Sequence, residues 1–117
     1  MIHRLTALML FLTLGACFRR ADSLHVIALP EAASESERTA LRDHLLQFNT
    51  RVHPDHPLYF DIGILHEPPA LRVRFNPEMT APKNIEHKLA DLGYTANALP
   101  GNSDTRSAFR ARLAPQP

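Results

Sequence analysis

The segment from Ala70 to Ala96 constrains the fold most, because its hydrophobic period changes once along its length. Residues 71–76 alternate between apolar and polar, which is the period of a strand with one buried face. After the turn at Asn76-Pro77, apolar residues recur at the spacing of one helix stripe, at Ile85, Leu89 and Leu92. Gly93 follows directly and favours a helix C-cap with a left-handed backbone. The segment therefore predicts a strand, a turn, a helix and a second strand.

Two strands and a helix are predicted upstream of this segment. Leu24–Leu29 is almost wholly aliphatic, which is typical of a central strand with neighbours on both sides. The spacing Ser34-x-x-Glu37 is that of a capping box and predicts the start of a helix. The buried stripe of this helix would consist of Leu41, Leu45, Phe48 and Val52. Tyr59–Leu65 alternates, and the proline-rich turn after it predicts an antiparallel hairpin with the strand at 71–75.

The order of the elements defines the expected fold class. With a last strand over Thr95–Leu99, the chain reads βαββαβ, which is the order of the ferredoxin-like sandwich. We therefore expect an α+β domain with a four-stranded antiparallel sheet and two helices on one face. On the polar face of the hairpin, Asp61 would pair with Arg72 and Arg74 across the strands.

Length limits the chain to one domain, because 117 residues are too few for two separate cores. We expect this domain over residues 24–100. The segment 101–117 is polar and ends in prolines, which favours a frayed or disordered tail over a short basic amphipathic helix.

The N-terminus resembles that of an exported lipoprotein. Residues 1–16 have the charged start, apolar run and small final residues of a signal peptide. Leu14-Gly15-Ala16-Cys17 resembles the lipobox of bacterial lipoproteins, whose signal peptidase cuts before a diacylated cysteine. The resemblance implies lipid on Cys17 and a tether over 17–23, whose last six residues reach at most ~20 Å. Phe18 in place of aspartate implies sorting to the outer membrane. The alternative is a plain signal peptide cut nearby, which would leave a free cysteine.

Cysteine usage and charge exclude several classes of function. Cys17 is the only cysteine, which excludes an intramolecular disulfide and a Cys-x-x-Cys metal site. The chain has 13 Lys and Arg against 12 Asp and Glu, and only Arg4 would leave with residues 1–16. Such a balance gives no electrostatic footprint for phosphate backbones, so we expect no nucleic-acid partner.

A family resemblance starts at Val73-x-Phe75-Asn76-Pro77 and continues through Ile85-x-x-x-Leu89-x-x-x-Gly93-Tyr94-x-Ala96. These residues resemble the heavy-metal-associated domains of copper chaperones and metal-pumping ATPases, in which a strand ends in such a turn and a helix ends in Gly-Tyr-x-Ala. Members bind a soft metal through Met-x-Cys-x-x-Cys in the loop after the first strand. The corresponding loop here, 30–36, holds no sulfur. The resemblance therefore implies the fold without thiolate metal transfer.

Histidines are the remaining metal candidates. His53, Asp55 and His56 lie together in a loop stiffened by prolines, and their side chains are ligands for Zn²⁺ or Cu²⁺. A structural site needs further ligands with support around them, and the sequence names none. We therefore favour solvated or turn-stabilising histidines and no cofactor, with a zinc or copper site as the alternative. The acidic cluster Glu31, Glu35 and Glu37 lies near a helix start, where the helix dipole alone favours carboxylates.

No enzymatic motif is present in the chain. It lacks a Gly-x-Ser-x-Gly elbow, a glycine-rich phosphate loop and His-Glu-x-x-His, and its first loop lacks the arginine of acylphosphatases. We therefore expect a non-catalytic lipoprotein of the bacterial envelope, anchored to the outer membrane and facing the periplasm. Its expected role is to bind an envelope protein through the open sheet face or an edge strand. The alternative is a histidine-dependent copper- or zinc-binding protein or an accessory of metal homeostasis.

Overall fold

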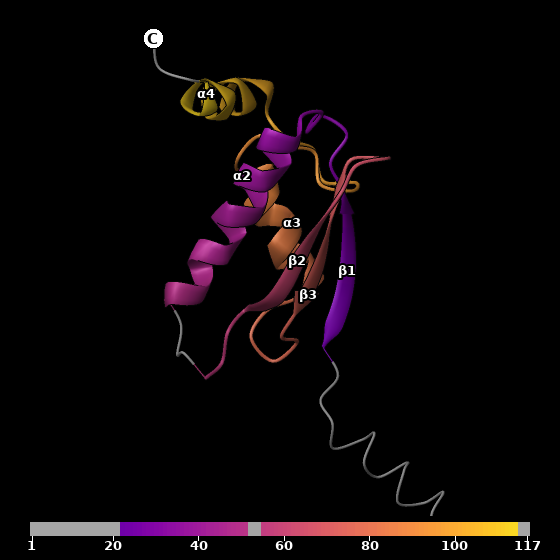
Figure 1. Cartoon of the computed structure of the whole chain (residues 1–117), viewed down its shortest axis with the longest axis vertical. Helices are drawn as coiled ribbons and strands as arrows, with labels where there is room; N and C mark the ends of the chain where they lie inside the picture. Colours follow the sequence, from indigo (N-terminus) through magenta and orange to yellow (C-terminus); the bar gives the residue numbers. More distant parts are fainter. Residues whose placement is uncertain (1–21, 52–54, 115–117) are drawn as a thin grey trace, which may run out of the picture.

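A three-stranded antiparallel sheet with helices packed on one face makes up the fold (Figure 1). The computed structural model describes residues 22–51 and 55–114. Its elements are β1 (Ser23–Ala28), α2 (Glu35–Leu46), the 3₁₀ helix η1 (Gln47–Arg51), β2 (Tyr59–Leu65), β3 (Ala70–Phe75), α3 (Pro82–Ala90) and α4 (Ser103–Leu113). The central strand is β3, and the order is β1-β3-β2. The predicted α+β class is confirmed.

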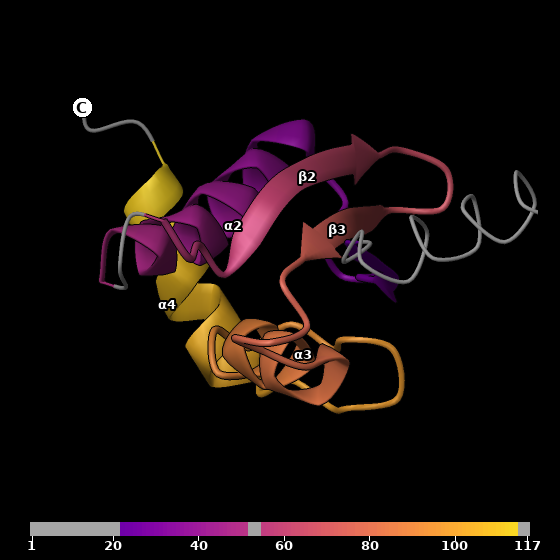
Figure 2. The same ribbon diagram turned by 90° about the horizontal axis from the view of Figure 1, so that it is seen from below.

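The core lies between the sheet and the helices α2 and α3, which are on the same side of the strands (Figure 2). Alternate strand residues point into it, among them Ile27, Ile62, Leu71 and Val73. The predicted helix stripes meet them with the fully buried side chains Leu41, Leu45, Ile85 and Leu89. Each such side chain contributes about 2 kcal/mol by leaving water. The periodicity in the sequence therefore identifies the buried face of both helices.

Local signals at two helix ends are confirmed. Ser34 is the N-cap of α2, and its Oγ accepts a hydrogen bond from the backbone N–H of Glu37 at 3.2 Å. The chain leaves α3 through Gly93, whose φ of +99° lies in the left-handed region. Tyr94 then enters the core and is fully buried.

The fourth strand is not formed, so the prediction of a four-stranded sheet was wrong for the described residues. Within the segment 95–99, Asn97 has a left-handed φ of +54° and a single bridge pairs Ala96 with Leu99. A strand requires extended backbone, and this tight reversal prevents it. Asn97 instead binds the edge of β1: its N–H donates to Ala28 O at 3.1 Å, and its Oδ1 accepts from Ala28 N at 2.8 Å.

Strand β1 is an edge strand, although its aliphatic sequence predicted a central one. Only one of its sides pairs with a strand, which is β3. Its alternate side chains Leu24 and Val26 are 58% and 47% exposed, because the helices cover the other face. An unbroken aliphatic run therefore marks a strand here without marking its place in the sheet.

The C-terminal segment is helical, which corrects the prediction of a frayed tail. Asn102 caps α4 by accepting from Thr105 N at 3.0 Å. Phe109 is the one buried residue of this helix, and its ring meets Tyr94 edge-on at 5.7 Å between centroids. One apolar anchor is too weak a pattern to show in the sequence. Residues 115–117 lie outside the described residues.

Substitution of Gly93 tests the path of the chain after α3. A Cβ at Gly93 would overlap the backbone of Arg106 and lie 2.6 Å from Asn102 O, and its φ disfavours any other residue. We expect Gly93→Ala to lower the free energy of unfolding by about 3 kcal/mol. Urea denaturation measures this change.

Gly63→Ala is the matched control. The atoms nearest to a Cβ at Gly63 would be those of the Arg72 guanidinium, the first at an ordinary 3.5 Å. We expect this variant to stay within about 0.5 kcal/mol of the parent. Equal losses in the two variants would contradict the tight contact at Gly93.

Candidate functional site

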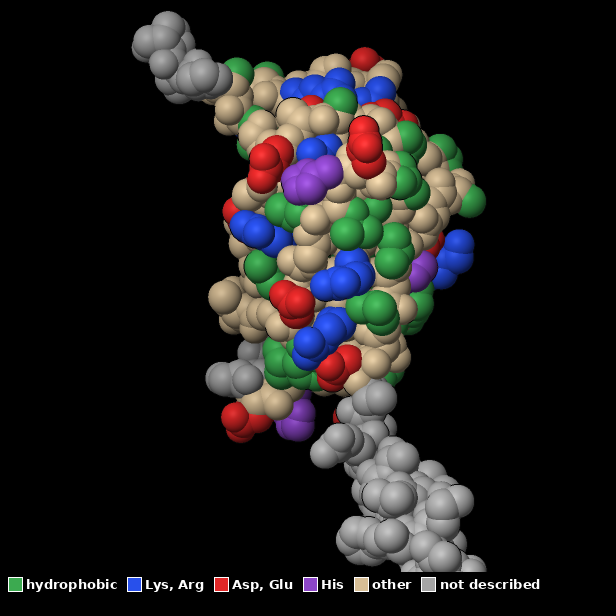
Figure 3. All heavy atoms as spheres, turned by 45° about the vertical axis from the view of Figure 1, so that its right-hand side comes forward, with side chains coloured by type: hydrophobic (Ala, Val, Ile, Leu, Met, Phe, Trp, Pro, Cys, Tyr) green, Lys and Arg blue, Asp and Glu red, His purple; other side chains and the backbone are tan. Residues whose placement is uncertain are grey.

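The side of the sheet away from the helices presents apolar and basic side chains together. Leu24 lies opposite Arg74, and Val26 lies opposite Arg72, in adjacent rows of β1 and β3. We call these four residues the open face. Phe60, 44% exposed, stands at the bulge of β2 beside it. Figure 3 shows hydrophobic and basic side chains next to one another on this side of the molecule.

The two arginines of the open face have different environments. Arg74 pairs with Asp22 at 2.8 Å, just before β1 begins. Asp61 lies in register with Arg74, as expected, but the carboxylate that Arg74 binds is that of Asp22. The guanidinium of Arg72 covers Gly63 of β2, and no carboxylate of the described residues lies within ion-pair distance of it. The open face therefore offers an unpaired cation beside apolar side chains.

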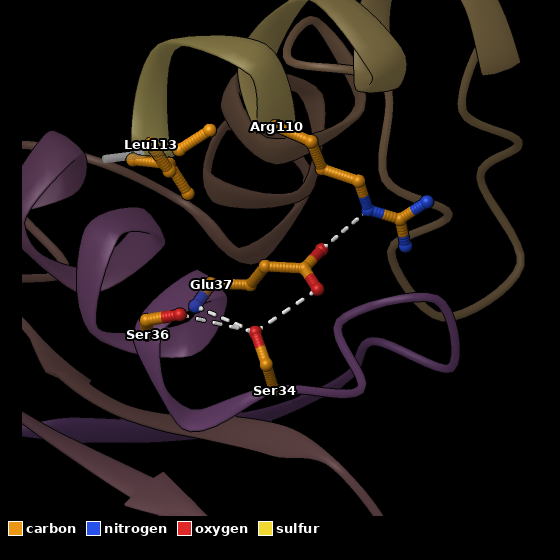
Figure 4. A pocket seen from close by; sticks show the side chains of 6 residues that line it. Ser34, Ser36, Glu37, Arg110 and Leu113 are labelled. Atoms are coloured by element: carbon orange, nitrogen blue, oxygen red, sulfur yellow. Dashed lines mark hydrogen bonds and ion pairs between the residues drawn. The ribbon is translucent and has the colours of Figure 1, made fainter. Parts of the chain in front are cut away.

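The loop 30–36 and the start of α2 are bonded to the C-terminal part of the chain. Glu37 Oε2 accepts from Tyr94 OH at 2.6 Å. It also accepts from Arg110 Nε at 2.7 Å (Figure 4). Glu31 accepts from the backbone N and the hydroxyl of Thr95 at 2.8 and 2.7 Å. Two carboxylates of the predicted acidic cluster thus bind protein donors. They attach α4 and the turn before it to the start of α2.

The hydrogen bond between Glu37 and Tyr94 moves the pKa values of the two groups in opposite directions. Burial acts to raise the pKa of Glu37, but hydrogen bonds from Tyr94, Arg110 and Ser34 outweigh it and bring the pKa below its ordinary 4.5. Burial and the hydrogen bond to Glu37 raise the pKa of the Tyr94 hydroxyl. At neutral pH the pair is a phenol bound to a carboxylate, which is a structural link.

A second polar cluster connects β1 to α3 through a buried carboxylate. Glu86 is 6% exposed, and its Oε2 lies 2.7 Å from His25 Nε2 and 2.9 Å from Asn97 Nδ2. Burial acts to raise the pKa of Glu86, but the hydrogen bonds from Asn97 and His25 prevail and lower it. His25 thus has a partner on another element, and the cluster fixes Asn97 at the sheet edge.

The site residues predicted from the sequence belong neither to the open face nor to the two polar clusters. Cys17 and His53 lie outside the described residues, so lipidation and the loop metal site stay predictions. Asp55 and His56 are exposed in the loop before β2. Within residues 22–51 and 55–114, no group of three His, Cys, Asp or Glu side chains is arranged to hold a metal ion.

Sequence reasoning missed the contacts that organise both clusters. Glu37 and Arg110 are 73 positions apart, and Asn97 reaches Ala28 across 69 positions. Neither distance leaves a local pattern. The available signal was the spacing of the arginines at 106 and 110, one helical turn apart, which supports the short basic helix that the sequence favoured less than a frayed tail.

Comparison with known proteins adds no relative to this description. No family model matches the chain, and neither does a curated protein or a solved structure. Among the described residues, no helix combines the length and the hydropathy that crossing a bilayer requires.

The Glu37 contact predicts a pH dependence of stability. The folded pKa of Glu37 is depressed, so its contribution is complete above the ordinary value of 4.5 and is lost as pH falls through the folded pKa. We expect Glu37→Gln to cost about 2 kcal/mol at neutral pH, because charge-assisted hydrogen bonds are lost. The loss should shrink as the solution is acidified below that range, which thermal melts across pH would show.

Glu35→Gln is the control for this prediction. Glu35 is exposed in the same first turn of α2. We expect a cost of at most about 0.5 kcal/mol, which reflects the helix dipole alone. A pH-independent loss in Glu37→Gln would show that packing, and not the carboxylate, stabilises the contact.

The loop metal site makes a separate prediction. The main interpretation, in which these histidines are solvated, predicts equal heats for the parent and for His53→Ala/His56→Ala in calorimetric titrations with Zn²⁺ and Cu²⁺. A site of micromolar or tighter affinity, worth about 8 kcal/mol, that disappears in the double variant would establish the alternative instead.

Proposed function

We propose that this chain is a lipid-anchored, non-catalytic interaction module of the bacterial envelope, whose open face binds a partner protein. The observation that supports it most is the exposure of Leu24 and Val26, at 58% and 47%, on one sheet face. Grouped apolar side chains beside arginines are typical of the centre of a protein interface.

The face is a better-supported contact surface than the free side of β1. Adding a strand to an edge requires its outward backbone groups. Asn97 already bonds Ala28 N and O there, and its Nδ2 lies 3.3 Å from Val26 O. Much of that edge is therefore occupied by the chain itself, while the open face is not.

The anchor would place this face beside the bilayer. The lipobox-like tetrad ends at Cys17, and β1 begins at Ser23, so the tether is at most ~20 Å long when extended. Leu24 follows Ser23 directly. A partner that reaches the open face would itself be a membrane protein or a protein held close to the membrane.

Descent from the ferredoxin-like fold is part of the proposal. A strand added beside β1, where Asn97 now binds, would complete the four-stranded sheet of that plan. The residues shared with heavy-metal-associated domains would then be structural, and their metal loop would have become the attachment point of α4.

The partner surface is tested by photo-crosslinking in cells. A photo-reactive amino acid at Leu24 should give a discrete adduct in the envelope fraction. Arg72→Glu in the same chain should reduce the adduct about tenfold, as expected when one central interface residue is lost. Mass spectrometry of the N-terminal peptide should show acyl chains on Cys17.

The control position is Ser107, which is exposed on α4. The same probe there should give no adduct of that size. An adduct from Ser107 and none from Leu24 would assign the contact to another surface, and an unmodified Cys17 would remove the anchor.

A further inference from the structure

Three basic or ionisable side chains from three elements gather around one aromatic ring. Lys88 Nζ of α3 lies 4.5 Å from the centroid of Phe48, and Arg51 Cζ of η1 lies 5.1 Å from it. The ring of His44 from α2 meets Phe48 edge-on at 5.5 Å. We call His44, Phe48, Arg51 and Lys88 the Phe48 cluster. Both cations make cation–π contacts with this half-buried ring.

The charge of the Phe48 cluster has no counter-ion in the described part of the chain. Lys88 Nζ donates to the hydroxyl of Tyr59 at 3.3 Å. This hydroxyl is neutral, because burial raises the pKa of Tyr59 to about 12. The nearest carboxylate along α2, Asp43, pairs with Arg42 at 3.1 Å. Among residues 22–51 and 55–114, the positive charge of the cluster is therefore not compensated by an ion pair.

Burial lowers the pKa of two groups in the Phe48 cluster, and neighbouring cations lower one of them further. The pKa of His44 is lowered first by burial and then by the charges of Arg112, Arg51 and Lys88. Burial also lowers the pKa of Lys88. An anion at this position would meet two permanent or near-permanent cations and reduce their repulsion.

The Phe48 cluster lies at the end of the molecule where the chain arrives from its tether. Tyr59 and Ser23 flank Phe75 in the same row across the sheet. Lys88 contacts Tyr59 directly, and Asn49 of η1 bonds Tyr59 O at 2.9 Å. Figure 1 shows that α2 ends and β1 begins at the same end of the fold.

We propose that the Phe48 cluster binds the phosphate groups of anionic phospholipids in the bilayer that carries the anchor. This inference rests on the proposed lipid anchoring, because a tether of at most ~20 Å holds this end near the headgroups. Basic side chains at an anionic surface each strengthen binding about fivefold, and an aromatic ring among them reaches the headgroup level. The lipid contact would orient the domain and leave the open face accessible from the side.

Vesicle binding of the mature chain tests the proposal. The chain from residue 17 onward with Cys17→Ser keeps every contact described above, because the described residues begin at Asp22. We expect it to bind vesicles of phosphatidylcholine mixed with phosphatidylglycerol, and to bind pure phosphatidylcholine at least about tenfold more weakly. Added salt should weaken the binding, since it screens the charges.

Two variants and one matched control assign the contact to the cluster. Arg51→Gln and Lys88→Gln should each weaken vesicle binding about fivefold, and their combination about 25-fold. Arg51 is exposed, so its substitution tests the site even if the half-buried Lys88 cannot be replaced without unfolding. Lys83→Gln removes the same charge from the same helix, and its side chain is 76% exposed near Glu86. It should change binding less than about twofold.

Several outcomes would overturn the proposal. One is equal binding of the chain to both vesicle types. Another is an equal loss of vesicle binding in Lys83→Gln and Lys88→Gln. Inorganic phosphate alone is the second probe: saturable shifts of the His44 resonances without vesicle binding would assign the cluster to a soluble phosphate ligand. The assay uses an unacylated chain, so a failure to bind vesicles would not contradict lipidation of Cys17. Conversely, an unmodified Cys17 in cells would refute the lipid anchor without changing these vesicle measurements.

Discussion

The close backbone contact after α3 is the constraint on which the rest of the structure depends. A Cβ at Gly101 would overlap the backbone of Gly93, and one at Gly93 would overlap that of Arg106. Two glycines therefore let three passes of the chain lie against each other. This contact sends Tyr94 into the core, turns Asn97 onto β1 and brings α4 beside α2.

The two ends of the molecule have opposite electrostatic conditions because of this path. At the end with the loop 30–36, α4 supplies Arg106 and Arg110 to Glu31 and Glu37, so these two carboxylates have cationic partners. At the other end, Arg51 and Lys88 beside Phe48 form no ion pair with a carboxylate of the described residues. A domain tethered by its N-terminus through the unmatched end would have a preferred orientation on an anionic surface.

Asn97 determines that β1 remains an edge strand. A fourth strand would have made β1 central and given Leu24 and Val26 a neighbour on the free side of their strand. One residue with a left-handed backbone supplies two hydrogen bonds to Ala28 in its place. The end of this edge at Ala28 is thereby occupied by few residues, and the open face keeps its apolar side chains exposed.

Local patterns in the sequence determined the helices α2 and α3, their buried stripes, the cap at Ser34, the left-handed turn at Gly93 and the hairpin of β2 and β3. Each depends on residues a few positions apart, so periodicity and cap chemistry are sufficient to predict it. The number of strands, the edge position of β1 and the order of α4 were decided only by tertiary structure. They depend on contacts such as Asn97 with Ala28 and Arg110 with Glu37, which join residues 69 and 73 positions apart. Pairing over such separations is chosen by the geometry of the whole chain, and a single sequence carries no local record of it.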